Sequence, residues 1–248
     1  MPHQARGISE SGYYHVVPKG INGQDIFERD ADRRLYVTLL AKAGKKTGVV
    51  ILAYCLMSNH VHLVLDDPQR HMSDFVKYVH ERYGTIHCRQ YGREGGVFGK
   101  KFWSEPIETD SHLLCAVRYV HANPANAGIC KASAYEWSSA KDYLGRKGIC
   151  NTSIVLDMCG GVEGFIRFSQ PVNATFLPFP GSKFSRHIRD DEARAIATDI
   201  FGHNPSQLAT KQREERNRGI VLLRERGLPA ALITRLTGIS KYVVLHTA

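Results

Sequence analysis

Short apolar runs predict the strands of this chain. Runs of β-branched and aromatic residues with few polar interruptions are typical of strands. A break at Ser58-Asn59 separates two neighbouring runs and predicts a hairpin between them. The runs occupy residues 13–17, 49–56, 60–65 and 102–107.

Segments with a helical period alternate with these runs. Apolar side chains recur at three- and four-residue steps over residues 31–46, behind Asp30 as a capping candidate, and over residues 72–86. Asp110 can cap a further helix after the last run. The order βαββαβ and then α predicts an α+β fold, a ferredoxin-like sandwich with an antiparallel sheet, helices on one face and one extra helix.

The pattern changes in the second half of the chain and predicts three parts. Residues 1–150 form the first domain, residues 151–187 an extension and linker, and residues 188–248 a small all-α domain. Near the end, two short helices flank a turn at Gly238, and Ser240 can cap the second. This arrangement is typical of a helix-turn-helix that binds DNA, although helical hairpins without DNA contacts are common.

Composition excludes several classes of protein. The chain has 248 residues, of which 43% are apolar and 23% charged, as in ordinary globular proteins. No apolar run approaches the roughly 20 residues of a membrane span, and no signal peptide is visible, so we expect a cytoplasmic protein without a membrane partner. The six cysteines form no C-x-x-C pair, which argues against a zinc ribbon.

The charge balance points to a polyanionic partner. Lys and Arg number 33 against 24 acidic residues, a net charge of +9. The excess is shared, with 20 basic and 15 acidic side chains in residues 1–150 and 13 and 9 in residues 151–248. Nucleic acid is therefore the leading partner class, and a merely basic surface is the alternative.

His60 and His62 are candidate metal ligands. They flank Val61 in a predicted strand, where side chains two apart project to the same face. Neutral imidazole is the commonest metal-binding side chain. The alternative is a pair of half-exposed sheet histidines.

A tyrosine on the last helix of the first domain is a candidate nucleophile. At about 100° per residue, Tyr119 and Asn123 lie within about 40° of each other, and His112 shares their flank. His121 is turned roughly 160° from Tyr119. A phenol with a pKa near 10 becomes a useful nucleophile beside a cation and a base. The alternative is a tyrosine at the edge of a core helix that ends in an asparagine.

These motifs occur in an order that resembles the HUH single-tyrosine transposases, and among them the REP-associated tyrosine transposases. The similarity runs from about Tyr13 to Gly145. The residues that carry it are Tyr14-His15-Val16-Val17, the run from Tyr54 to Val64 around His60-Val61-His62, the run from Arg118 to Pro124, Ala127-Gly128 and Glu136-Trp137-Ser138-Ser139-Ala140.

The resemblance implies a metal-dependent single-stranded DNA endonuclease and strand transferase. It implies cleavage beside hairpins, at REP-like elements or insertion-sequence ends, through a 5′-phosphotyrosine intermediate with Mg²⁺ or Mn²⁺. By position, Tyr119 is the nucleophile, and His60, His62 and Asn123 are metal ligands. We expect a nucleoid-associated protein, and both a monomer and a homodimer remain open.

Further cations and aromatic residues are candidates for binding DNA. Lys100, Lys101 and Trp103 follow a glycine-rich loop and can hold a backbone and stack an unpaired base. Arg118 precedes the tyrosine. The alternative is a solvated loop with its aromatic residues in the core.

Two other functions remain open from the sequence. One is a domesticated, non-catalytic DNA-binding or regulatory protein on the same scaffold. The other is a zinc hydrolase that uses the two histidines and a water, for which no third histidine or carboxylate stands at a suitable spacing.

Overall fold

The chain divides into two compact units, residues 1–175 and 176–248. The computed structural model describes residues 7–99, 101–170, 197–198, 200–201, 205–225, 228 and 230–247. Each unit has a hydrophobic core of its own. Residues 171–187 of the predicted linker lie outside the described residues.

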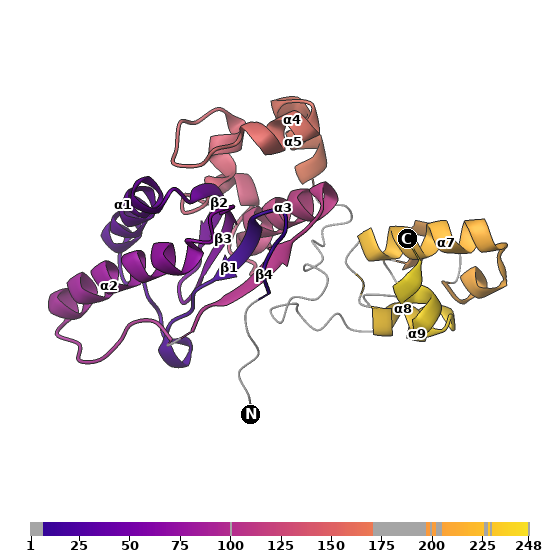
Figure 1. Cartoon of the computed structure of the whole chain (residues 1–248), viewed down its shortest axis with the longest axis horizontal. Helices are drawn as coiled ribbons and strands as arrows, with labels where there is room; N and C mark the ends of the chain where they lie inside the picture. Colours follow the sequence, from indigo (N-terminus) through magenta and orange to yellow (C-terminus); the bar gives the residue numbers. More distant parts are fainter. Residues whose placement is uncertain are drawn as a thin grey trace. The chain divides into compact units, whose positions relative to one another are not determined.

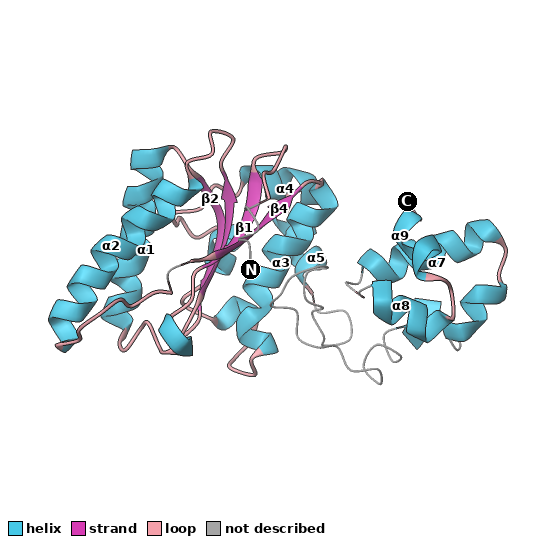
Figure 2. Ribbon diagram, turned by 60° about the horizontal axis from the view of Figure 1, so that its bottom comes forward, coloured by secondary structure: helices cyan, strands magenta, loops and turns pink. Residues whose placement is uncertain are grey.

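A four-stranded antiparallel sheet forms the centre of the first unit. Its strands stand in the order β2-β3-β1-β4, so β1 and β3 are the inner pair (Figure 1). Figure 2 shows the sheet in magenta between helices. The ferredoxin-like topology predicted from the alternating periods is confirmed. The strands are β1 Tyr13–Val17, β2 Val50–Leu56, β3 Val61–Asp66 and β4 Trp103–Ile107.

Helices cover both faces of this sheet. Helices α1 (Asp30–Thr47) and α2 (Met72–Tyr91) pack on one face, and α3 (Asp110–Asn126) lies on the other (Figure 1). The first face buries the large apolar core, and α3 covers the second with its buried stripe, including Leu113 and Val117. Helix α2 extends past the predicted residue 86 to Tyr91, and Gly92 follows as its left-handed cap with a φ of 61°.

Two predicted helix caps were wrong by one residue. Arg29 rather than Asp30 precedes α1, and Thr109 rather than Asp110 precedes α3. The Thr109 hydroxyl accepts a hydrogen bond from the backbone N–H of His112 at 3.2 Å. The two aspartates occupy the first turn instead, where a carboxylate interacts favourably with the helix dipole.

The start of α2 depends on a buried carboxylate. Asp67 is 2% exposed. Its two oxygens accept backbone hydrogen bonds from His71 at 2.9 Å and Met72 at 2.6 Å. These bonds satisfy two of the donors that every helix leaves free at its start.

We expect Asp67→Ala to lower the free energy of unfolding of the first unit by about 1–3 kcal/mol, because two buried donors lose their partner. Both tryptophans, Trp103 and Trp137, belong to this unit, so urea unfolding followed by tryptophan fluorescence reports on it alone. Asp157→Ala, at an exposed site on α4, is the control. Equal losses in the two variants would contradict the capping role.

Beyond α3, the chain packs back against that helix. The segment η3 (Ser139–Leu144) is followed by α4 (Ser153–Cys159) and α5 (Val162–Ser169). Tyr143 stacks on Phe165 with ring centroids 4.5 Å apart, and His121 of α3 meets Tyr143 edge-on at 5.1 Å. These contacts hold α3 against η3 and α5, and the Tyr143 hydroxyl also donates to the Leu52 carbonyl of β2 at 2.8 Å.

The described part of the second unit is helical. It contains η4 (Pro205–Thr210), α7 (Arg213–Glu225), α8 (Ala230–Thr237) and α9 (Lys241–His246). Gly238 turns the chain between α8 and α9 with a φ of +74°, and the Ser240 hydroxyl accepts from the Val243 N–H at 3.4 Å. Among the described helices of both units, none combines the length and apolarity that a membrane span requires.

Candidate active site

Strand register brings a set of polar side chains to the sheet face under α3. His15 lies opposite Val64 on β3 and opposite Glu105 on β4. Because residues two apart on a strand share a face, His62 and Trp103 project to the same side. A row of polar and aromatic side chains therefore crosses three strands beneath a helix.

The two histidines of the H-x-H motif face each other. Their Nε2 atoms are 3.1 Å apart, and the rings are nearly perpendicular with centroids 4.9 Å apart. His62 lies in β3 and is 1% exposed, whereas His60 precedes the strand and forms an isolated bridge with Lys19. The Asn59 side-chain oxygen lies 2.6 Å from Nδ1 of His60, which orients this ring.

Tyr119 of α3 lies directly beside this pair. Its ring is edge-on to His62 and to His15, with centroid distances of 5.5 Å and 5.9 Å. The side chain is 7% exposed, and burial raises its pKa to about 12. A phenol in this environment stays protonated at neutral pH unless a cation or base intervenes.

Asn123 stands one turn after the tyrosine, held by its own helix. Pro124 has no N–H, so the Val120 carbonyl loses its usual helical partner. The Asn123 amide nitrogen donates to that carbonyl at 3.4 Å and to the Tyr119 carbonyl at 2.8 Å. Both bonds use the nitrogen, so the side-chain oxygen is the atom that Asn123 can offer to a cation.

His121 of α3 faces away from Tyr119, as the helical geometry predicts. His121 Nε2 lies 2.8 Å from the Ser139 hydroxyl, and its ring packs against Tyr143. His121 therefore packs with η3 and α5 and is not among the side chains around Tyr119.

Burial keeps His15, His60 and His62 neutral. It lowers the pKa of His15 to about 3, with a smaller contribution from His112, and that of His60 to about 4, with a smaller contribution from Lys19. The pKa of His62 is also well below its ordinary value because of burial. Neutral imidazole is the form that binds metal ions.

The imidazole pair fits a divalent cation. Two adjacent ligands of an octahedral ion with bonds of about 2.1 Å lie about 3.0 Å apart, close to the 3.1 Å between the two Nε2 atoms. Among the described residues, no three His, Cys, Asp or Glu side chains are grouped to hold a metal. The amide of Asn123 is of another ligand type.

Sequence reasoning missed two polar residues of this face. His15 is fully buried in β1, and Glu105 of β4 has a buried carboxylate oxygen without a hydrogen-bond partner in the described ranges. Burial raises the pKa of Glu105 to about 7. The sequence did contain a signal for both residues. Each is a polar residue at a strand position where the alternation of side chains predicts one that points inward.

The predicted DNA-binding residues are scattered. Trp103 belongs to the cluster, with its ring edge-on to His15 at 5.2 Å. Lys101 is exposed, and Lys100 lies outside the described residues. The Arg118 guanidinium lies over the Phe168 ring at 4.6 Å, so this side chain is directed toward α5 rather than toward Tyr119.

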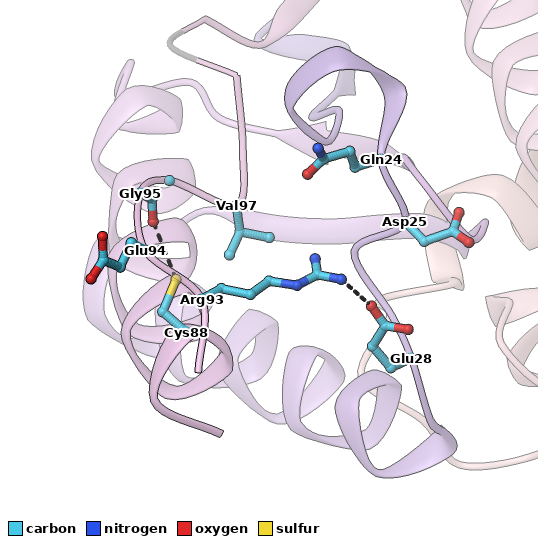
Figure 3. A pocket seen from close by; sticks show the side chains of 9 residues that line it. Gln24, Asp25, Glu28, Cys88, Arg93, Glu94, Gly95 and Val97 are labelled. Atoms are coloured by element: carbon cyan, nitrogen blue, oxygen red, sulfur yellow. Dashed lines mark hydrogen bonds and ion pairs between the residues drawn. The ribbon is translucent and has the colours of Figure 1, made fainter. Parts of the chain in front are cut away.

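A pocket elsewhere in the first unit has a different character. Its lining includes Gln24, Asp25 and Glu94, together with an ion pair between Arg93 and Glu28 at 2.6 Å (Figure 3). None of the clustered histidines lines it. The candidate nucleophile and the candidate metal ligands therefore lie outside this pocket.

In a comparison with known proteins, residues 9–123 match a family model described as "Transposase IS200 like". A Haemophilus influenzae protein whose name describes a REP-associated tyrosine transposase is 26% identical over 88 residues. The match covers 31% of this chain and 50% of that protein, so the chain spans about half the length of this curated relative.

A solved structure shares the fold of the first unit. It is a REP-associated tyrosine transposase bound to a REP hairpin, similar with a TM-score of 0.50 and 14% sequence identity. The similarity covers 59% of this chain and 87% of that chain. At this identity, the likeness concerns the arrangement of the helices and strands.

Proposed function

Because residues 9–123 match the family model of IS200-like transposases, we propose that this chain cuts and rejoins single-stranded DNA beside imperfect hairpins. The observation that carries the proposal is the meeting of Tyr119 with His60 and His62. The tyrosine ring is 5.5 Å from the His62 ring, and the two imidazoles face each other at 3.1 Å. A nucleophile beside a pair of metal-binding nitrogens is an arrangement that supports transfer of a phosphodiester to the protein.

Tyr119 is the proposed nucleophile. Its oxygen attacks a phosphorus of the strand, the new bond joins the phenol oxygen to the 5′-phosphate, and the bond to the 3′ oxygen breaks. The phenol proton leaves to solvent or a base, and the departing 3′ oxygen takes up a proton. Attack by a 3′-hydroxyl on the phosphotyrosine reverses these changes and joins two strands.

His60, His62 and Asn123 are the residues that would hold Mg²⁺ or Mn²⁺. The histidines would bind through Nε2, because Nδ1 of each already has a partner, Asn59 for His60 and His15 for His62. When bound, the cation supplies Lewis-acid stabilisation of charge on the phosphate and eases loss of the phenol proton.

The substrate is proposed to be single-stranded DNA with a hairpin, as in REP-like elements or insertion-sequence ends. Trp103 stands beside the cluster and offers a face for an unpaired base. Lys100 and Lys101 are proposed to contact phosphates, whereas Arg118 packs over Phe168. A nucleoid location would follow from DNA binding. The meeting of His62 and Tyr119 within one chain supports a site built by a monomer, and a homodimer remains the alternative.

Formation of a covalent adduct tests this function. We expect the protein, mixed with Mn²⁺ and single-stranded oligonucleotides that carry the hairpins flanking its gene, to form an SDS-resistant adduct. EDTA, His60→Ala or His62→Ala should remove it. DNA binding that survives EDTA, with no adduct under any divalent metal, would instead favour a non-catalytic DNA-binding or regulatory protein on this scaffold.

We further propose that the second unit, which contains the helical domain predicted over residues 188–248, binds duplex DNA through α9. Helices α8 and α9 are joined by a tight turn at Gly238. One side of α9 packs inward through buried Val244, whereas Tyr242 is 72% and Leu245 51% exposed. Together with Lys241, they form an amphipathic surface suited to the major groove, where apolar side chains contact thymine methyl groups.

Tyr242→Ala is expected to weaken binding of the full chain to duplex DNA by about tenfold or more, because one base contact contributes about 1–3 kcal/mol. Fluorescence anisotropy with a labelled duplex measures this effect. Leu222→Ala, at a partly exposed position on α7, is the control and should leave the affinity unchanged. An unchanged affinity in both variants would contradict the role of α9.

A further inference from the structure

Three imidazoles form a continuous chain beneath α3. His60 Nε2 lies 3.1 Å from His62 Nε2, and His62 Nδ1 lies 3.0 Å from His15 Nε2. His15 and His62 are 0% and 1% exposed. Both nitrogens of the His62 ring are therefore engaged, one toward His60 and the other toward His15.

The proton on His60 can be located from its neighbour. The Asn59 side-chain nitrogen donates to the Gly23 carbonyl at 3.0 Å, so the amide oxygen is the atom that faces His60 Nδ1 at 2.6 Å. A carbonyl oxygen only accepts, so Nδ1 of His60 carries the hydrogen. In the neutral ring, Nε2 of His60 then presents a lone pair.

The proton on His62 has two possible positions. If Nε2 carries it, this nitrogen donates to His60 and the two rings simply bond to each other. If Nδ1 carries it, two lone pairs face each other at 3.1 Å, an arrangement that suits a shared cation. Metal ligation through Nε2 requires the second arrangement, in which Nδ1 donates to His15.

We propose that His15 is a positioning residue that accepts the Nδ1–H of His62 and so holds His62 in the tautomer that ligates the divalent cation. The inference rests on the proposed metal-dependent function and adds a residue to it. Partners of this kind raise metal affinity by about 10–100-fold, because they fix both the tautomer and the orientation of the ligating ring.

The surroundings of His15 suit this role. β1 is an inner strand, bonded to β3 on one side and β4 on the other, so its backbone is fixed. The His15 ring is nearly parallel to that of His62, at an interplanar angle of 16°, and nearly perpendicular to the rings of Trp103 and Tyr119, at 83° and 80°. The ring cannot turn without displacing these neighbours.

Mn²⁺ binding to the full chain, followed by electron paramagnetic resonance of the free ion, tests the proposal without an activity assay. His15→Phe keeps a ring but has no acceptor, and we expect it to weaken Mn²⁺ binding by about 10–100-fold. His15→Gln offers an amide oxygen and should recover most of the affinity. His121→Phe removes an equally buried histidine on the far side of α3 and should leave Mn²⁺ binding unchanged.

A second measurement uses the parent protein alone and does not depend on the variants folding. In long-range ¹H–¹⁵N spectra with saturating diamagnetic Mg²⁺, His62 should be protonated at Nδ1, and His15 should be unprotonated at Nε2. A His62 proton on Nε2 in the loaded protein, or unchanged Mn²⁺ affinity in a folded His15→Phe, would overturn the role of His15. Absence of Mn²⁺ binding that depends on His60 in the parent would instead overturn the proposed metal site, and the role of His15 with it.

Discussion

We expect Tyr119→Phe to abolish covalent attachment to DNA and to lower cleavage by at least about a thousandfold, as removal of a nucleophile does in other covalent enzymes. The change removes one oxygen and keeps the ring, which packs edge-on against His62 and His15. The fold, metal binding and DNA affinity should therefore stay at parental levels. The expected loss is therefore confined to cleavage and covalent attachment.

Strand labelling makes this test specific for the direction of attack. A 5′-phosphotyrosine link leaves the 3′ portion of the strand on the protein and releases the 5′ portion with a 3′-hydroxyl. A 3′-labelled hairpin substrate should therefore label the parent protein in SDS gels, whereas a 5′-labelled one should give a shorter free strand. Tyr78→Phe on α2 is the matched control and should behave as the parent does.

Two results would contradict the assignment. Full adduct formation by Tyr119→Phe would place the nucleophile elsewhere. Label on the protein from the 5′-labelled strand would show that the tyrosine is linked to a 3′-phosphate. The mechanism would then differ from the one that the family resemblance implies.

Acid should destabilise the first unit strongly between pH 7 and pH 4. Burial lowers the pKa of His15 and His121 to about 3 and that of His60 to about 4. The unfolded chain takes up protons on these residues near pH 6.5, whereas the folded chain does not. The free energy of unfolding therefore has its full value above pH 6.5 and falls as the pH drops below it. At pH 5, each of the three imidazoles removes about 2 kcal/mol.

The sum for three residues is comparable to the whole stability of many domains. We therefore expect the urea midpoint, read from tryptophan fluorescence, to fall steeply from pH 7 to pH 5. Glu105 acts in the opposite direction, because the folded chain keeps its proton up to about pH 7, but this side chain is partly exposed and its effect is smaller.

A single substitution isolates one of these contributions. His121→Leu removes one buried imidazole away from the candidate active site, so its pH dependence should be shallower than that of the parent by about 2 kcal/mol between pH 8 and pH 5. A parent protein equally stable at both pH values would show that the histidines are protonated in the folded chain.

Local pattern was sufficient for much of the fold. The stripe of apolar residues in α2 and the β-branched runs of β2 and β3 predicted those elements, because helix and strand periods act over a few residues. The exact caps were not predictable in the same way. Thr109 and Asp110 are both acceptable capping residues. Only the path of the preceding chain decides which of them lies just before the first helical turn.

The candidate site was partly accessible to the same reasoning. Spacing by two placed His60 and His62 together, and helical geometry separated His121 from Tyr119, because both relations depend on neighbours in the sequence. Arg118 shows the limit of this reasoning. It adjoins Tyr119 in the chain, but it lies over Phe168 of α5, a segment whose packing no local period describes.

By itself, the sequence determined the periodic elements, the basic charge and which side chains share a strand face or a helix flank. Only the tertiary structure decided that β1 stands between β3 and β4 and that α3 crosses this face, which brings His15 against His62 and Tyr119 beside both. The physical reason is that a side chain's own element sets the direction in which it points, whereas the order and register of strands set what it meets. Those depend on the packing of the whole domain.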